Sequence, residues 1–231
     1  MTPHVLLHAV MFIGVLTIGG CFNDAAFYQK ACAGGDVGGC FNLGARYDEG
    51  VGVLPDSGQA VDFYQKACAG GEARGCYNLG VRYAEGKVVP RDLRLAIMFY
   101  QKACDGGVAQ GCNNLGVRYA TGDGVSRDPA QAMALYRKAC EGGVAEGCFN
   151  LGNMYMDGNG VSSNLDQTLA FYWKACDGGV AQGCVNLGVM SELGIGMKRD
   201  DAEALQHYRK ACNLKEQVGC DNYAKLKSGR R

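Results

Sequence analysis

The sequence predicts an all-α protein, a right-handed α/α superhelical solenoid of short repeats, and three observations support this prediction. Cysteines recur with a period of 36 residues, and a fixed period of this length is typical of repeat architectures. Each period contains two stretches whose apolar residues follow the i, i+3, i+4, i+7 spacing of an amphipathic helix. Glycine-rich turns separate these stretches, so one period corresponds to one helical hairpin.

Composition narrows the classes of function. The chain has 231 residues, 48% of them apolar, and its 23 basic side chains balance 23 acidic ones. This composition suits a folded soluble protein. Zero net charge gives no basic field that would favour nucleic acid or an anionic membrane as a partner. Glycine and cysteine are both unusually abundant, with 36 and 13 copies, and the repeats must explain both.

The first residues indicate export. Residues 5–18 form an apolar stretch of the length found in signal peptides, shorter than the roughly 20 residues that cross a membrane. We therefore expect residues 1–20 to be a signal peptide and the mature protein to be secreted or periplasmic. The sequence IGGC, which ends at Cys21, is similar to a bacterial lipobox, so Cys21 is a candidate for lipidation and anchoring in the cell envelope.

Two features argue against lipidation. The opening MTPH contains no lysine or arginine, and helical sequence begins almost directly after Cys21, which leaves no tether. A buried or unpaired Cys21 on an uncleaved helix is the alternative.

The first helix of a unit is exemplified by GCFNLGARYDEG, residues 39–50. Its buried stripe is formed by Cys40, Leu43, Gly44 and Tyr47. A glycine inside a helix costs about 1 kcal/mol relative to alanine. Its recurrence in five units therefore predicts close backbone contact between helices at Gly44, Gly80, Gly116, Gly152 and Gly188.

The second helix of a unit begins at Asp56, a good N-cap that follows Pro55. It ends in a glycine pair at residues 70–71, which is a common helix stop. Its apolar side is formed by Ala60, Phe63, Tyr64 and Ala67.

One hairpin cannot bury both of its faces, so neighbouring hairpins must stack. We expect residues 21–231 to form a single solenoid with units at about 37–72, 73–108, 109–144, 145–180 and 181–216. A lone second-type helix, residues 23–32, precedes the units. A polar first-type helix within residues 217–231 caps the other end.

Twelve of the thirteen cysteines form six C-x7-C pairs, and each pair joins the second helix of one unit to the first helix of the next. Even pairing in an exported chain favours disulfides. A zinc site would need about four ligands, and the exported part has a single histidine, His207, and no C-x-x-C. Six equivalent pairs also argue against reactive-thiol chemistry. The expected bridges are Cys32–Cys40, Cys68–Cys76, Cys104–Cys112, Cys140–Cys148, Cys176–Cys184 and Cys212–Cys220.

The repeated pattern GCxNLGxxYxxG, followed by A…YxKAC, resembles the Sel-one-like repeat, a relative of the tetratricopeptide repeat. The cysteine pair at every junction is similar to the secreted, cysteine-rich members of this family in bacteria. The resemblance covers residues 23–227. Two positions depart from the pattern: Ser191 stands where other units have tyrosine, and Thr168 stands where they have alanine.

The resemblance implies a right-handed solenoid whose first-type helices line a concave face. It also implies an adaptor that binds peptides or proteins on that face, whereas some members are described as weak penicillin-binding β-lactamases. In related helical repeats an asparagine ladder bonds the main chain of an extended peptide, and an amide can both donate and accept. The matching residues are Asn42, Asn78, Asn114, Asn150, Asn186 and Asn222. The alternative is that each asparagine ties the inter-repeat loop or caps its own helix.

One turn further along, a basic stripe is expected at Arg46, Arg82 and Arg118, and it changes to methionine at Met154 and Met190. Such a groove, polar at one end and apolar at the other, would orient a peptide. Candidate side-chain contacts are Phe41, Tyr77 and Phe149. The alternative is that the arginines pair on a solvated surface with Asp48, Glu49 or Glu85.

Catalytic motifs are not apparent. A serine β-lactamase needs S-x-x-K, and no serine has a lysine three residues later. A metal-dependent enzyme needs several histidines. We therefore expect no catalytic residues, no cofactor and no metal, and a monomeric, exported, non-catalytic scaffold that binds a peptide or protein. The alternatives are a weak β-lactamase, supported by the resemblance alone, and a structural scaffold or effector of the envelope.

Overall fold

The computed structural model describes residues 25–229, and within them it contains twelve α-helices and no strand. First-type helices are α2 (Val37–Glu49), α4 (Ala73–Glu85), α6 (Ala109–Thr121), α8 (Ala145–Asp157), α10 (Ala181–Leu193) and α12 (Gln217–Lys227). Second-type helices are α1 (Ala25–Ala33), α3 (Ser57–Ala69), α5 (Leu93–Asp105), α7 (Pro129–Glu141), α9 (Leu165–Asp177) and α11 (Asp201–Asn213). The expected signal peptide and Cys21 lie outside the described residues.

The helix ends follow from the local sequence. The second-type helices from α3 onward begin at an aspartate or asparagine N-cap; at Asp56, for example, the carboxylate accepts a hydrogen bond from the Gln59 N–H at 3.0 Å. The first-type helices α2 to α10 end at a glycine in the left-handed region, such as Gly50 with φ of 70°. These stop signals fix every helix of a full unit at 13 residues, so all hairpins have the same length and can stack in register.

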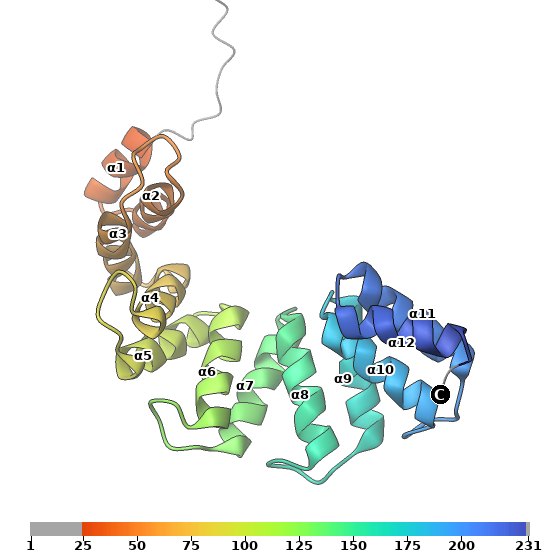
Figure 1. Cartoon of the computed structure of the whole chain (residues 1–231). Helices are drawn as coiled ribbons and strands as arrows, with labels where there is room; N and C mark the ends of the chain where they lie inside the picture. Colours follow the sequence, from red (N-terminus) through yellow and green to blue (C-terminus); the bar gives the residue numbers. More distant parts are fainter. Residues whose placement is uncertain (1–24, 230–231) are drawn as a thin grey trace, which may run out of the picture.

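The hairpins stack in chain order and the stack curves into an arc, with α1 and α12 at its two ends and α6 to α8 near its middle (Figure 1). Every helix packs against its neighbours in the sequence. Contacts between alternate helices include α4 with α6 and α10 with α12, which are first-type helices. First-type helices therefore approach one another closely, as expected for the inner side of a curved stack. The molecule is a helical-repeat solenoid.

The core repeats with the units. The first-type helices α2, α4, α6, α8 and α10 each contribute one leucine that is at most 1% exposed, and these residues are Leu43, Leu79, Leu115, Leu151 and Leu187. The glycine that follows each leucine accommodates the tyrosine ring of the second-type helix in its own hairpin. A Cβ at Gly44 would lie 2.9 Å from two ring atoms of Tyr64. The helices approach closely at this glycine, but the nearest group is an aromatic ring instead of the predicted backbone, and the Ala60 carbonyl oxygen would lie 3.2 Å from the added Cβ.

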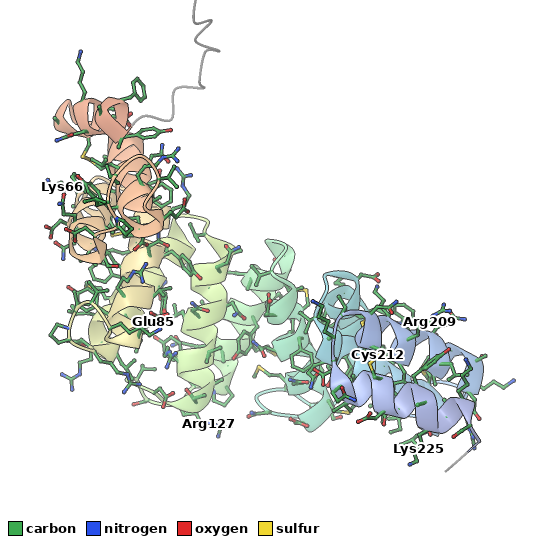
Figure 2. The ribbon with its side chains drawn as sticks, turned by 45° about the horizontal axis from the view of Figure 1, so that its top comes forward. Lys66, Glu85, Arg127, Arg209, Cys212 and Lys225 are labelled. Carbon is green, nitrogen blue, oxygen red and sulfur yellow. A yellow bond between two sulfur atoms is a disulfide. The ribbon has the colours of Figure 1, made fainter. Side chains whose placement is uncertain are left out.

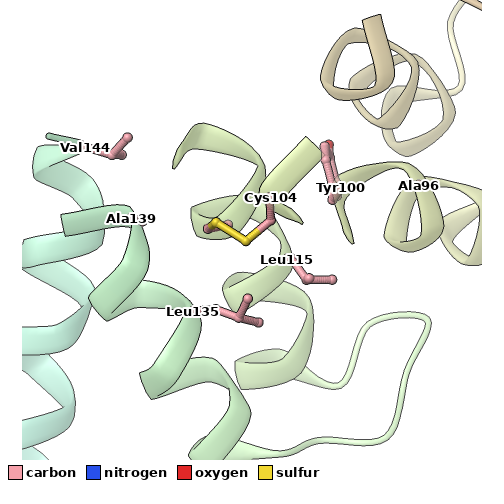
Figure 3. Packing of buried hydrophobic residues seen from close by; sticks show 8 residues of the cluster. Ala96, Tyr100, Cys104, Leu115, Leu135, Ala139 and Val144 are labelled. Atoms are coloured by element: carbon pink, nitrogen blue, oxygen red, sulfur yellow. A yellow bond between two sulfur atoms is a disulfide. The ribbon is translucent and has the colours of Figure 1, made fainter. Parts of the chain in front are cut away.

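Six disulfides join the pairs expected from the sequence, with Cα atoms 4.5–4.7 Å apart. They are spaced along the ribbon in Figure 2, where Cys212 of the last pair is labelled. Each bridge links consecutive hairpins. The bridge at Cys104 lies in one cluster with Leu115 and Leu135, which both belong to the next hairpin (Figure 3). The disulfides are thus part of the core between repeats.

The two departures from the repeat pattern are accommodated inside the core. Thr168 is fully buried, and its hydroxyl donates to the Asn164 carbonyl at 2.9 Å. Ser191 is also fully buried and lies 3.4 Å from the sulfur of Met197. Both polar side chains have a partner, so the affected units retain the hairpin packing of the others.

Candidate functional site

The expected asparagine column, Asn42 to Asn186 at intervals of one repeat, lies on the first-type helices, and its side chains are half-buried. Three of these amides lie close to tyrosine hydroxyls of the preceding hairpin and act to lower the pKa of those tyrosines. The pairs are Asn78 with Tyr64, Asn114 with Tyr100, and Asn186 with Tyr172. These asparagines therefore lie where side chains of successive repeats meet.

Asn150 makes a different connection. Its amide donates at 3.1 Å to the Oδ1 atom of Asn113, which lies on the first-type helix of the preceding hairpin. An asparagine amide has two N–H donors and an oxygen with two lone pairs, so one such bond leaves most of its capacity unused. The column can thus hold the repeats together and still present polar groups.

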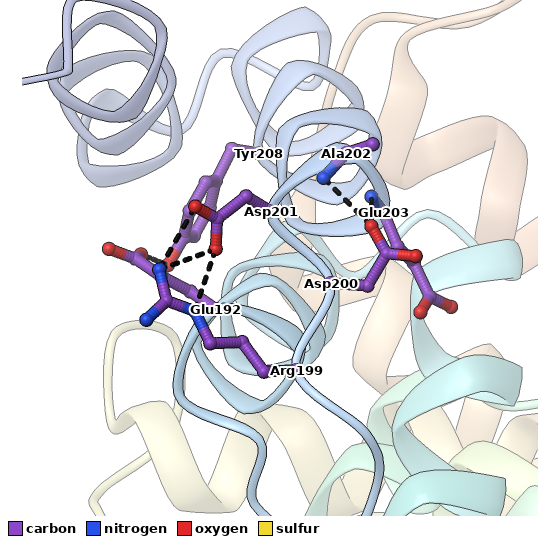
Figure 4. Close-up of polar contacts among 7 residues, drawn as sticks. All are labelled: Glu192, Arg199, Asp200, Asp201, Ala202, Glu203 and Tyr208. Atoms are coloured by element: carbon purple, nitrogen blue, oxygen red, sulfur yellow. Dashed lines mark hydrogen bonds and ion pairs between the residues drawn. The ribbon is translucent and has the colours of Figure 1, made fainter.

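Tyrosines of several second-type helices supply polar contacts that the sequence did not reveal. The Tyr64 hydroxyl donates to Asp48 at 3.0 Å, and Asp48 also pairs with Arg82 of the next repeat. Burial raises the pKa of Tyr64, and the neighbouring Asp48 carboxylate raises it further. In the last hairpin the Tyr208 hydroxyl donates to Glu192 at 2.7 Å (Figure 4). The one sequence signal for these tyrosines was their constant spacing from the mid-helix glycine of the same hairpin.

The three arginines of the expected basic stripe have partners, two of them in a neighbouring repeat and one in the same repeat. Arg46 lies over the Tyr28 ring, 5.7 Å from its centroid, and Arg118 is 3.4 Å from Asp123. Arg82 pairs with Asp48, one of the acidic residues considered as an alternative. The Arg82 and Arg118 side chains are 24% and 21% exposed. The stripe is therefore partly enclosed and largely neutralised.

The prediction that methionines form an apolar end of the groove is wrong. Met154 is 5% exposed and Met190 is 1% exposed, so neither presents a surface to a ligand. They lie in the core clusters of Tyr136 and Tyr172, respectively. A methionine carries no charge that must reach water, and it fills the space between repeats instead of lining the face.

The candidate aromatic contacts are half-buried beside the asparagine column. Each packs against the tyrosine of its own hairpin, with ring centroids separated by 5.9 Å for Phe41, 6.3 Å for Tyr77 and 5.8 Å for Phe149. Arg74 of the next repeat covers the Phe41 ring at 4.3 Å. The other two units have Asn113 and Val185 at this position. The first-type face therefore carries an aromatic-rich row parallel to the asparagine column.

Within residues 25–229, no group of three or more histidine, cysteine, aspartate or glutamate side chains is placed to hold a metal ion. In the same part of the chain, every helix is too short or too polar to cross a membrane. Disulfides persist in oxidising compartments, so the six bridges indicate an extracytoplasmic environment.

A family model described as Sel1 repeat matches residues 25–36, 37–72, 73–108, 109–144, 145–180 and 181–216. No curated protein matches the sequence. Among solved structures, a protective antigen of uropathogenic Escherichia coli that displays an SLR fold is 32% identical, with a TM-score of 0.84. The alignment covers 88% of this chain and 44% of the antigen, so this chain spans less than half the length of that relative.

Two more distant structures share the fold. A Sel1 repeat protein from Oxalobacter formigenes is 21% identical with a TM-score of 0.78, and the alignment covers 88% of both chains. An immunity protein from Pseudomonas aeruginosa is 22% identical with a TM-score of 0.53, and the alignment covers 84% of this chain and 75% of that one.

Proposed function

Because this chain belongs to the Sel1 repeat family, we propose that it is an exported, non-catalytic scaffold that binds a peptide or protein along the face of its first-type helices. Helical-repeat solenoids contain an extended surface that suits an elongated partner. The partner is expected to bind across several repeats, because equivalent side chains recur once in each unit.

The observation that carries this proposal is the asparagine column. Five half-buried amides lie on successive first-type helices at a constant spacing of one repeat. Asn150 is held by its hydrogen bond to Asn113 of the preceding repeat, and Asn78, Asn114 and Asn186 lie close to tyrosine hydroxyls of the preceding repeat. Fixed amides lose little conformational entropy on binding, and their unused donors and acceptors match the main chain of an extended peptide.

Contacts beside the column would supply affinity. Phe41, Tyr77 and Phe149 offer aromatic surface, and aromatic residues dominate many peptide interfaces. Arg46, Arg82 and Arg118 lie one helical turn away and retain unused N–H donors. The Nε atoms of Arg82 and Arg118 are buried and have no hydrogen-bond partner among the described residues. Because these atoms cannot reach a ligand, the terminal guanidinium nitrogens would make the contact.

A peptide library displayed on phage and selected on the oxidised protein tests this proposal. Peptides that bind the wild type should lose binding to the Asn78→Ala, Asn114→Ala, Asn150→Ala triple variant. The matched control is Gln29→Ala with Gln65→Ala, which removes two exposed amides from second-type helices. Circular dichroism must show that both variants are folded. Equal binding to wild type and triple variant would contradict the proposal.

Export is the second part of the proposal, with a signal peptide in residues 1–20 and Cys21 as the lipidation candidate. The oxidised cysteine pairs support an extracytoplasmic location. Mass spectrometry of the mature N-terminus distinguishes a lipid-modified Cys21 from another cleavage site. An intact Met1 on protein recovered from cells would contradict export.

Hydrolysis of β-lactams is not part of the proposal, because no observation in residues 25–229 favours it. Purified protein is expected to turn over penicillins no faster than a reduced, unfolded control. Saturable hydrolysis by the oxidised protein would require a catalytic function instead.

A further inference from the structure

A pocket of about 460 Å³ lies away from the asparagine column, between the second-type helices α7 and α9. Its α7 side is formed by Arg137 and Glu141, and Tyr155 of α8 forms the base. The residues from the α9 side are Asn164, Gln167, Phe171 and Lys174. A pocket of this size accommodates a short ligand segment, for example two or three residues of a peptide.

The two basic side chains of this pocket have no carboxylate partner among the described residues. Arg137 donates from Nη2 to the Tyr155 hydroxyl at 2.9 Å, and Lys174 lies over the Phe171 ring at 5.6 Å from its centroid. At the next junction the equivalent lysine, Lys210, pairs with Asp177 at 2.7 Å. The corresponding ion pair between Lys174 and Glu141 is not formed. Arg137 and Lys174 can therefore both bind an anion.

The surroundings hold Arg137 in place. Tyr155 is 8% exposed, and its ring stacks on Phe171 with centroids 5.7 Å apart and ring planes within 9° of parallel. The hydrogen bond to this fixed hydroxyl orients the guanidinium group. Because arginine has five N–H donors in a rigid plane, one bond to a phenol leaves enough of them to bind a carboxylate through two bonds.

The α9 side adds polar and apolar groups beside the cations. The Asn164 oxygen caps α9 by accepting from the Gln167 N–H at 3.0 Å, which leaves its NH₂ group unused. The Gln167 side chain also has no hydrogen-bond partner among residues 25–229. We propose that this pocket binds the C-terminal carboxylate of a peptide, through Arg137 and Lys174. The amides contact the last peptide groups, and Phe171 contacts the last side chain.

Sequence differences distinguish this junction from the earlier ones. The positions equivalent to Arg137 in earlier units are occupied by Gln29, Gln65 and Gln101. Gln101 is also engaged, since its amide donates to Asp105 at 2.9 and 3.0 Å. Glu141 at the rim of the pocket disfavours a second carboxylate, so the final residue is expected to be uncharged or basic.

The test uses acetyl-Ala-Ala-Phe with a free carboxylate and the same peptide as a carboxamide. Two-dimensional NMR of the oxidised protein should show that the free acid shifts the Arg137 Nε–H and the Gln167 side-chain amide. The carboxamide should bind at least about tenfold more weakly, because the charge-assisted hydrogen bonds are lost. Arg137→Gln, which restores the residue of the earlier units, should weaken binding of the acid by a similar factor.

Arg209→Gln is the matched control, because Arg209 lies at the same repeat position but lines a different pocket with Trp173 and His207. Arg209→Gln should leave binding of the free acid unchanged. The triple asparagine variant should also leave it unchanged, so a failure of the pocket proposal can be distinguished from a failure of the proposed peptide-binding face. Equal binding of acid and carboxamide, no binding up to millimolar peptide, or an equal loss in Arg209→Gln would each overturn the proposal.

Discussion

At the residue scale, a recurring tyrosine has two roles in the hairpin. Its ring packs against the mid-helix glycine of its own first-type helix, and its hydroxyl lies near polar side chains of the first-type helices. Tyr64 and Tyr208 are at most 2% exposed, so their hydroxyls need partners inside the protein. A helix interior tolerates the glycine because the ring fills the space that a Cβ would otherwise occupy.

Gly80→Ala is expected to destabilise the protein. The added Cβ would lie 2.6 Å from two ring atoms of Tyr100, and a buried ring cannot move away without disturbing its neighbours. Overpacking of this kind costs about 1–3 kcal/mol. Urea denaturation of the oxidised protein measures the loss in free energy of unfolding.

Gly38→Ala is the control for this substitution. Gly38 lies in the first turn of α2, where the equivalent residues of other repeats are Arg74 and Glu146, so the position accepts a side chain. The control should be as stable as wild type or slightly more stable, since alanine favours a helix. Equal losses in both variants would show that the Tyr100 ring does not explain the glycine.

His207 makes stability sensitive to acid. Burial lowers its pKa, because the charged imidazolium would lose water, and Lys210 acts in the same direction. Glu203 and Asp177 oppose this effect, with Glu203 Oε1 at 3.7 Å from Nε2. A histidine pKa that is lower in the folded state stabilises the fold above the unfolded pKa of about 6.5, and this contribution is lost as pH falls through the folded pKa.

His207→Phe should therefore reduce the loss of stability between pH 8 and pH 5. Earlier hairpins have Phe63, Phe99 and Phe171 at the equivalent position, so a phenyl ring suits the site. Fluorescence of Trp173, the only tryptophan, follows unfolding directly, since its ring centroid lies 4.6 Å from that of His207. An identical acid-induced loss in variant and wild type would exclude His207 as its source.

Sequence spacing placed the asparagines on one helix face but did not reveal their partners. The contact of Asn78 with Tyr64 joins two helices of different hairpins, and its geometry depends on how the hairpins stack. The burial of Met154 could not be predicted for the same reason. Periodicity indicates which side of a helix is apolar, whereas the fit of one hairpin on the next decides which borderline residues are enclosed.

At the element scale, helix bounds were the most predictable feature. The sequence placed a first-type helix at residues 39–50 and the structure has Val37–Glu49; its end was predictable because the glycine stop is a local signal, whereas the N-cap Asp36 was not identified from the sequence. The pocket between α7 and α9 was not predictable, since three helices line it and no local motif marks it.

The last inter-repeat turn departs from the others at Lys215. Its φ is 64°, in the left-handed region, where the equivalent residues are Gly35, Gly71, Gly107, Gly143 and Gly179. A side chain in this conformation costs about 1–2 kcal/mol. Lys215→Gly is therefore expected to raise the free energy of unfolding by up to about 1 kcal/mol, after allowance for the greater freedom of glycine in the unfolded chain.

Lys215→Ala separates this backbone effect from loss of the lysine charge. It should leave stability unchanged, because alanine has the same difficulty with a positive φ. Thermal unfolding of the three proteins provides the comparison. If the glycine variant were no more stable than the alanine variant, backbone strain at this turn would not be the explanation.

At the scale of the whole molecule, stability resides in contacts between neighbouring hairpins. A solenoid has no single central core, so the free energy of each interface adds to the next. Every disulfide closes a loop with a sequence separation of 8 and crosses one such interface. In the chain-entropy model, a loop of this length contributes about 2.5 kcal/mol. The six bridges therefore hold the stack in the curved form that presents the asparagine column.

The most direct test of this account is the redox state of the cysteines in the native protein. Alkylation of the denatured, unreduced protein, followed by peptide mapping, identifies each free and each paired thiol. The expected result is that twelve of the thirteen cysteines resist alkylation, each paired with the cysteine eight residues away. Twelve alkylated cysteines would contradict both the disulfide-linked solenoid and the inference of an oxidising compartment.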